Sequence, residues 1–396
     1  MKKLTEHVSY VGVQNPGMRI FDIIMRTEYG TSYNSYVVKG EKTAVIETVH
    51  EDYGKEFLEN IACVAEIGKI DYVILNHTEP DHAGSLVTLL EANPEIEVYG
   101  TAVALRNVKE ITNREMKSHV VKTGEKLDLG GGVELEFIVA PNLHWPDSMF
   151  TYFEKEHVLF SCDVFGSHFC EPEVLDSYVK DPDTLRGERK NYYDCIFGPF
   201  KRFVVAGMEK IKDLKIDMIC TSHGPVLQKY IEETMNDYRE WSKPAELEKT
   251  IAIFYVSAYG YTKSMAEKFK EIFEKNGVKT KLFNLVEADM SEAVEALHTA
   301  KAVLFGSPTI NQDALKPVWD LISCTEAIGL KTAKTPALTF GSYGWSGEAC
   351  RYLDERLRTL KYQVVSDGVT CIFKPAAKDE ARIEEAAEKV LEAIGE

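Results

Sequence analysis

The sequence predicts two domains: an N-terminal α+β domain rich in short strands, and a C-terminal α/β domain built on a doubly wound parallel sheet. Its 396 residues are sufficient for about two or three domains. With 44% hydrophobic and 10% aromatic residues, the chain has the composition of a globular protein. The spacing of its apolar runs changes near residue 245, and this change separates the two predicted domains.

The N-terminal part contains short apolar runs that are typical of strands. Residues 35–38 and 43–49 flank Lys39-Gly-Glu-Lys42, a pattern that predicts a β-hairpin. Four further apolar runs each lead into histidines or carboxylates; they span residues 72–75, 134–140, 157–162 and 217–222. Loops at the carboxyl ends of strands can converge on one crevice, so we expect these polar residues to meet.

Beyond residue 249, apolar strands alternate with amphipathic helices. The predicted strands cover residues 250–256, 302–305 and 336–340. The predicted helices cover residues 263–275, 314–322 and 347–360, and a charged helix runs from Lys378 to Glu396. Strands separated by helices of this length predict βαβ units and a parallel, doubly wound sheet. Residues 240–249 are polar and include Pro244, so we place the domain limits at 1–248 and 249–396.

Charge and composition exclude several classes of partner. A formal net charge of -17 argues against nucleic acid and against an anionic membrane surface, since both need a clustered basic face. The N-terminus has no apolar segment typical of a signal peptide, and no run approaches the length of a bilayer span, so a cytoplasmic protein is expected. The eight cysteines lack a C-x-x-C pair, which predicts reduced, mostly buried thiols rather than disulfides or a zinc ribbon.

Histidines and carboxylates follow the four apolar runs in a pattern that is typical of metal ligands. The stretch N-H-T-E-P-D-H-A-G-S, residues 76–85, holds two histidines and two carboxylates. The full set of candidate ligands is His77, Glu79, Asp81, His82, His144, Asp163 and His223. Ionised carboxylates are costly to gather in one place unless a cation compensates their charge. We therefore predict a dinuclear metal site.

The pattern H-x-E-x-D-H, followed by a lone histidine, a strand-end aspartate and a late His-Gly, resembles the metallo-β-lactamase fold and specifically its flavodiiron branch. This resemblance implies an αββα sandwich for residues 1–248. The hydrolase branch usually carries histidine where this chain has Glu79. A carboxylate adds negative charge and a hard oxygen ligand, which suits iron better than a zinc pair.

The resemblance also implies a role for each candidate ligand. One iron takes His77, Glu79 and His144, the other takes Asp81, His82 and His223, and Asp163 bridges the two. Two residues outside the ligand set are expected to serve catalysis. His168 is similar to a histidine of the family that hydrogen-bonds at the pocket. The pocket phenol comes from Tyr192 or Tyr193, of which we assign Tyr193.

The C-terminal domain carries three polar loops after predicted strands. The first, residues 257–265, is neither G-x-G-x-x-G nor a P-loop, but its hydroxyls and amides precede a helix and can hold a phosphate. Residues 306–311 and 341–347 supply small residues and aromatic rings that could flank a planar heterocycle. The three loops resemble those of flavodoxin, which implies flavin mononucleotide (FMN).

The flavodoxin resemblance assigns FMN contacts residue by residue. The phosphate contacts are Ser257, Tyr259, Gly260, Tyr261 and Thr262. The isoalloxazine contacts are Pro308, Thr309, Asn311, Ser342, Tyr343, Gly344 and Trp345.

Together the two resemblances cover essentially the whole chain and imply a flavodiiron protein. Such an oxidoreductase reduces dioxygen to water, nitric oxide to nitrous oxide, or both, with electrons passed through FMN from an external carrier such as rubredoxin. A head-to-tail homodimer is implied, with a tetramer as a dimer of dimers as a further option. The metal ligands are common to both activities and do not distinguish the gases.

Two other functions are compatible with parts of the pattern. A zinc-dependent hydrolase of the metallo-β-lactamase type, with a regulatory flavodoxin-like domain, would contain two zinc ions and act without reductant. A non-enzymatic electron carrier with a structural metal site would consume no gas. Metal analysis together with a visible spectrum separates iron and flavin from the zinc hydrolase.

Overall fold

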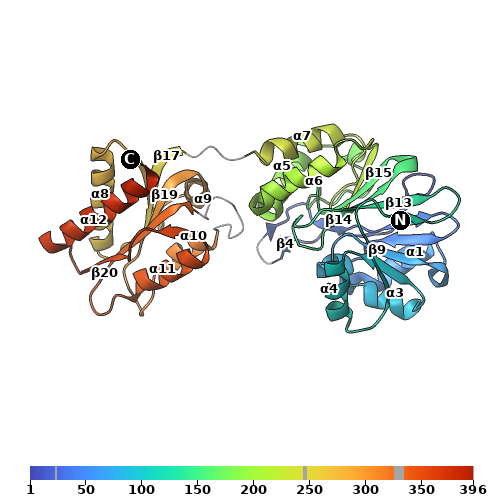
Figure 1. Cartoon of the computed structure of the whole chain (residues 1–396), viewed down its shortest axis with the longest axis horizontal. Helices are drawn as coiled ribbons and strands as arrows, with labels where there is room; N and C mark the ends of the chain where they lie inside the picture. Colours follow the sequence, from blue (N-terminus) through green and yellow to red (C-terminus); the bar gives the residue numbers. More distant parts are fainter. Residues whose placement is uncertain (23–24, 244–247, 325–333, 396) are drawn as a thin grey trace. The chain divides into compact units, whose positions relative to one another are not determined.

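The computed structural model describes residues 1–22, 25–243, 248–324 and 334–395 (Figure 1). The chain forms two compact units, Met1–Lys243 and Pro244–Glu396. Residues 244–247, which belong to the polar stretch 240–249 where we place the domain boundary, lie outside the described residues. Each unit is described by itself.

The first unit contains two facing sheets. The larger has the order β1-β2-β7-β8-β9-β10-β11. Its strands are β1 (Lys2–Lys3), β2 (Val8–Tyr10), β7 (Tyr36–Lys39), β8 (Thr43–Ile46), β9 (Tyr72–Leu75), β10 (Glu97–Gly100) and β11 (Lys117–Val120). Strands β7 and β8 pair antiparallel with Lys39 opposite Thr43, so the predicted hairpin is confirmed. From β8 to β11 the strands run parallel.

The smaller sheet has the order β12-β13-β14-β15-β16. Its strands are β12 (Lys126–Asp128), β13 (Glu134–Val139), β14 (Met149–Phe153), β15 (Val158–Cys162) and β16 (Met218–Thr221). Only β15 and β16 pair in parallel within it. Two short ribbons join β3 (Val13–Asn15) to β6 (Thr31–Tyr33) and β4 (Ile20–Phe21) to β5 (Met25–Arg26).

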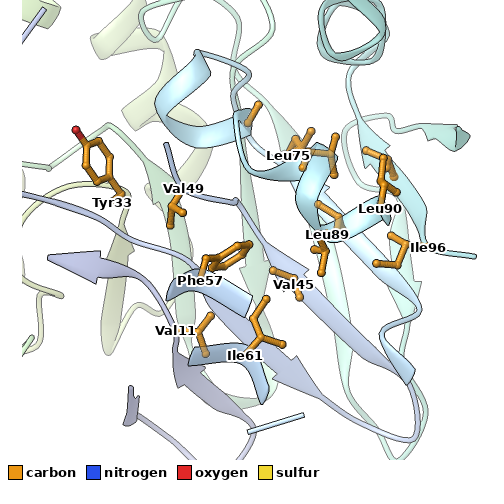
Figure 2. Packing of buried hydrophobic residues seen from close by; sticks show 14 of the residues in the cluster. Val11, Tyr33, Val45, Val49, Phe57, Ile61, Leu75, Leu89, Leu90 and Ile96 are labelled. Atoms are coloured by element: carbon orange, nitrogen blue, oxygen red, sulfur yellow. The ribbon is translucent and has the colours of Figure 1, made fainter. Parts of the chain in front are cut away.

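Alternating apolar side chains explain the layers of this unit. In β8, Ile46 points between the two sheets, where it shares a buried cluster with Phe137 of β13 and Phe160 of β15. Val45 points the other way and shares a buried cluster with residues of the helices α1 (Gly54–Ala62), α3 (Leu86–Ala92) and α4 (Ala102–Thr112). Figure 2 shows Val45 beside Phe57 of α1. Helices α5 (Pro182–Tyr192), α6 (Lys201–Ile211) and α7 (Ile231–Trp241) cover the smaller sheet. The predicted αββα sandwich is confirmed.

The second unit is a parallel sheet of order β18-β17-β19-β20-β21, with β22 also paired to β20. Its strands are β17 (Glu248–Tyr255), β18 (Lys279–Asn284), β19 (Ala300–Gly306), β20 (Pro336–Tyr343), β21 (Gln363–Val364) and β22 (Val369–Ile372). Helices α8 (Tyr261–Lys275) and α12 (Ala377–Ile394) cover one face. Helices α9 (Met290–Thr299), α10 (Lys316–Ser323) and α11 (Glu348–Thr359) cover the other. The doubly wound fold is confirmed.

The structure adds elements that the apolar runs did not reveal. Strand β18 lies at the sheet edge and carries the mixed sequence KTKLFN, so it lacks the continuous apolar run of a buried parallel strand.

None of the helices in the described part of the chain has the length and apolar character of a bilayer span.

Candidate metal centre and mononucleotide site

The seven candidate ligands lie at the carboxyl ends of strands from both sheets of the first unit. His77 and Glu79 follow β9, and Pro80 then starts the short helix α2 (Pro80–Ala83), which carries Asp81 and His82. The other three, His144, Asp163 and His223, lie in the loops after β13, β15 and β16. Because the two sheets pack face to face, residues from distant parts of the chain come together at this edge.

The first group consists of His77, Glu79, His144 and Asp163. One ligand atom from each lies within 4.8 Å of the others. The Oε2 atom of Glu79 is 3.3 Å from His77 Nε2 and 3.1 Å from His144 Nε2. The Oδ2 atom of Asp163 is 3.8 and 3.7 Å from the same two nitrogens. Imidazole and carboxylate atoms thus surround one small volume.

The second group consists of Asp81, His82 and His223, again with ligand atoms within 4.8 Å of one another. Asp81 Oδ2 is 3.0 Å from His223 Nε2, and Asp81 Oδ1 is 3.4 Å from His82 Nε2. The remaining oxygen of Asp163, Oδ1, is 3.2 Å from His82 Nε2 and 3.6 Å from His223 Nε2. One carboxylate therefore turns one oxygen toward each group.

Hydrogen bonds at the far side of two imidazoles orient them toward these groups. His77 Nδ1 lies 3.2 Å from Asp147 Oδ1, and the Thr78 hydroxyl donates to Asp147 Oδ2 at 2.6 Å. His223 Nδ1 donates to the Ser32 carbonyl oxygen at 2.6 Å. Outer partners of this kind set the tautomer of a metal-binding histidine. Sequence reasoning missed both partners, although Asp147 lies in the same loop as His144.

The charges of the groups compensate one another. Burial lowers the pKa of His77, but hydrogen bonds to Asp147 and Glu79 outweigh it and raise that pKa to about 10. Burial opposes ionisation of Asp163, yet the charged imidazole of His82 and its neighbours hold the pKa of that carboxyl well below its usual range. In this way positive charge on the imidazoles balances the negative charge of the carboxylates. A bound metal cation would supply the same positive charge and would displace protons from the imidazoles that bind it.

The donor set fits a pair of iron ions. Carboxylate oxygens are hard ligands, and imidazoles complete a mixed N/O environment that iron accepts. The second group also holds buried polar atoms without a hydrogen-bond partner among the described residues, Asp81 Oδ1 and His82 Nε2, and both face inward. A cation between them would satisfy both atoms.

The two residues predicted to act beside the ligands have different positions. His168 is buried next to the second group, with its ring 4.9 Å from that of Tyr192 and 5.2 Å from that of His223. Its Nδ1 lies 2.8 Å from Thr31 Oγ1, and burial lowers its pKa to about 3.

The assignment of Tyr193 to the pocket is wrong. Its hydroxyl lies 2.7 Å from Ser242 Oγ, and its ring packs against Tyr238 and Trp241. The Tyr192 hydroxyl donates instead to Asp163 Oδ1 at 3.0 Å. Tyr192 is the last residue of α5, and Tyr193 begins a short π-helix, Tyr193–Phe197. Successive helical residues point in different directions, so only one of the two tyrosines faces the carboxylate.

In the second unit, the three predicted loops lie at the carboxyl ends of the adjacent strands β17, β19 and β20. Gly260, with a φ of 84°, precedes helix α8, a left-handed conformation that glycine adopts without strain. Ser257 Oγ accepts the Lys263 N–H at 3.2 Å, so the loop folds over the first turn of that helix. Free amides of a helical first turn are suited to a phosphate group.

The loops are joined to one another. The Thr262 hydroxyl is buried and lies 2.9 Å from Ser342 Oγ, and the Thr309 N–H donates to the Ser342 carbonyl at 3.0 Å. Thr262 therefore links two loops through its side chain rather than presenting its hydroxyl at the surface.

Aromatic rings stand exposed around these loops. Tyr259 is 85% exposed and Trp345 is 93% exposed, so both rings are free to contact a planar ligand held by these loops. A Cβ on Gly344 would lie 2.6 Å from the ring of Phe373, so glycine permits this close approach. Phe373 follows β22, is itself 56% exposed, and was not predicted as part of the site. The arrangement fits a planar ligand with a phosphate.

Comparison with known proteins supports both halves. Residues 31–224 match the family model described as ODP family beta lactamase, and residues 253–386 match the flavodoxin model. The chain is 44% identical to the flavo-diiron protein FprA2 of Clostridium acetobutylicum over 383 residues, 95% of each chain. It is 34% identical to the type A flavoprotein fprA of Rhodobacter capsulatus over 382 residues, 94% of this chain and 86% of that protein. Among solved structures, rubredoxin oxygen:oxidoreductase from Desulfovibrio gigas is similar with a TM-score of 0.73 and 29% identity, covering 99% of this chain and 98% of that one.

Proposed function

The chain belongs to the flavodiiron protein family, whose members are oxidoreductases, and from this premise we propose that it reduces dioxygen to water, nitric oxide to nitrous oxide, or both. The observation that carries the proposal is Asp163, whose two oxygens face two separate groups of imidazole and carboxylate ligands. A single carboxylate between two such groups is suited to a pair of metal ions.

We assign the ligands of the two irons according to these groups. His77, Glu79 and His144 would hold one ion, Asp81, His82 and His223 would hold the other, and Asp163 would bridge them. When bound, the iron pair and the flavin supply the electrons for the reduction and the open coordination positions for the gas.

The residues around the iron site control access and protons. The side chains of His77 and His82 are at most 1% exposed, whereas Glu79 is 20% and His144 is 13% exposed. A small gas would therefore enter on the side of Glu79 and His144. The Tyr192 hydroxyl oxygen lies 3.0 Å from Asp163 Oδ1, to which it donates its proton in a hydrogen bond, so Tyr192 holds a proton beside the proposed bridging carboxylate.

The second unit would hold FMN. Backbone amides at the start of α8, with Ser257 and Gly260, would bind the phosphate, and the loops that contain Thr309 and Ser342 would surround the ring system beside Trp345. The Desulfovibrio gigas relative is named for rubredoxin, so a small electron-transfer protein of that kind is the proposed donor. We propose a head-to-tail homodimer, in which the flavin of one subunit serves the irons of the other.

Metal and flavin analysis of anaerobically purified protein tests this function. The expected result is two irons and one FMN per subunit, with consumption of dioxygen or nitric oxide that depends on a reduced donor. Two zinc ions with reductant-independent hydrolysis would establish the hydrolase instead. Iron and FMN without gas consumption would establish an electron carrier.

A further inference from the structure

Glu47 is a buried carboxylate beside the metal centre that the proposed function leaves without a role. It directly follows β8, is 1% exposed, and has a φ of 59°, a left-handed conformation that few residues other than glycine adopt. Its Oε1 atom accepts the Asn76 N–H at 2.7 Å. Its Oε2 atom is buried without a hydrogen-bond partner in the described structure. Strained backbone and an unpaired buried oxygen are both costly, and such features concentrate at functional sites.

His82 has the complementary feature. Its Nε2 atom faces Asp163 and Asp81 in the second ligand group. Its Nδ1 atom is buried, and no described residue forms a hydrogen bond with it. In two other ligand histidines this nitrogen has a partner. His77 Nδ1 faces Asp147, and His223 Nδ1 donates to the Ser32 carbonyl oxygen. A neutral imidazole that binds metal through Nε2 carries its proton on Nδ1, so His82 requires an acceptor there.

Glu47 and His82 are held close together by their backbones. One ligand atom from each, together with Cys162 Sγ, lies within 4.8 Å of the others. Thr48, the next residue after Glu47, donates both its N–H, at 2.8 Å, and its hydroxyl, at 2.7 Å, to the His82 carbonyl. This pair of bonds ties the end of β8 to α2 and holds the Glu47 carboxyl beside the His82 imidazole.

Cys162 does not replace Glu47 as the acceptor. Its sulfur lies 3.8 Å from Asp163 Oδ2, and a thiol sulfur is a weak acceptor.

We propose that Glu47 is the positioning residue for His82: its Oε2 accepts the Nδ1–H of the imidazole and directs Nε2 toward the metal held by Asp81, His82 and His223. The inference rests on the proposed function, because it requires a metal ion in that group. Glu47 would then orient His82 in the same way that Asp147 orients His77.

The substitution Glu47→Gln tests the proposal with little change in volume. Glutamine keeps one acceptor oxygen but places an NH₂ donor at the other position, so it can satisfy either Asn76 or His82, not both. Loss of an outer partner weakens metal binding about 10–100-fold. We expect this loss for one of the two irons, with the other unchanged, in anaerobic ferrous iron titrations against a competing chelator. Mössbauer spectra of ⁵⁷Fe-loaded protein should change in one of two iron signals.

The control variant is Glu156→Gln in the same unit. Glu156 Oε1 lies 2.9 Å from His7 Nδ1, a histidine–glutamate pair outside the seven proposed ligands. This variant should bind both irons with wild-type affinity. If Glu47→Gln also binds both irons with wild-type affinity and spectrum, Glu47 serves only Asn76, and the proposal is refuted.

A measurement without any variant covers the case in which Glu47→Gln does not fold. In a crystal structure of the metal-loaded wild type, we expect Glu47 Oε2 within about 3.2 Å of His82 Nδ1. A water or another residue as the acceptor would overturn the proposal. Wild-type protein without iron would refute the proposed function itself, whereas wild-type protein with two irons and an unaffected Glu47→Gln variant refutes only the role of Glu47.

Discussion

Metal-free protein should lose stability between pH 6.5 and 10 because of His77. The pKa of this histidine is raised from 6.5 to about 10, since hydrogen bonds to Asp147 and Glu79 outweigh the effect of burial. A group whose pKa is raised by folding stabilises the protein fully below its unfolded pKa. That stabilisation is lost as the pH rises through the folded value. At about 1.4 kcal/mol for each pH unit between the two values, His77 contributes at most about 5 kcal/mol to the free energy of unfolding.

The assay compares unfolding of metal-free wild type and the variant His77→Gln in urea at pH 6 and pH 9. We expect the advantage of the wild type over the variant to shrink by several kcal/mol toward the higher pH. At pH 9 the unfolded imidazole is deprotonated, so folding must take up the proton that the folded imidazole, with its pKa of about 10, still binds. Iron-loaded wild type should lack this dependence, since its imidazole binds metal in the neutral form. An advantage that stays constant or grows from pH 6 to pH 9 would show that His77 is not held protonated by Asp147 and Glu79.

Four further changes test the site. Asp163→Ala removes the oxygens that face both ligand groups, so at least one iron should be lost while FMN remains; two irons per subunit in elemental analysis would refute bridging. Glu79→His should shift metal preference toward zinc and abolish gas reduction, and turnover with iron would contradict the role of the carboxylate. Tyr192→Phe removes a hydrogen bond to a buried carboxylate, worth about 1.5–3 kcal/mol, and should slow gas consumption at unchanged iron content. Finally, subunits of Asp163→Ala can be exchanged with those of a flavin-deficient double variant, Ser257→Ala with Thr262→Ala. The mixed dimer should consume gas, which neither parent does. Verified exchange without gas consumption would exclude electron transfer across the subunit boundary.

The sequence by itself determined the general architecture and the family. The alternation of apolar strands and helices after residue 249 predicts a doubly wound sheet because a parallel strand buried on both faces must be continuously apolar. The spacing H-x-E-x-D-H directly after the run 72–75 identifies the ligand type, because ligands within a few residues of one strand end share one local geometry. Such local signals require no knowledge of distant contacts. They missed β18, whose edge position leaves it only partly buried.

Only the tertiary structure decided which atoms meet. Asp163, after β15, meets the ligands that follow β9 because these two strands belong to different sheets that pack face to face. The choice of Tyr192 over Tyr193 depends on which side of α5 faces the carboxylate, a rotation that two adjacent tyrosines do not reveal. The partner of His223 is the backbone carbonyl of Ser32, 191 residues away, and a carbonyl group is the same in every residue. Contacts of this kind depend on packing between distant segments, which no local pattern of side chains encodes.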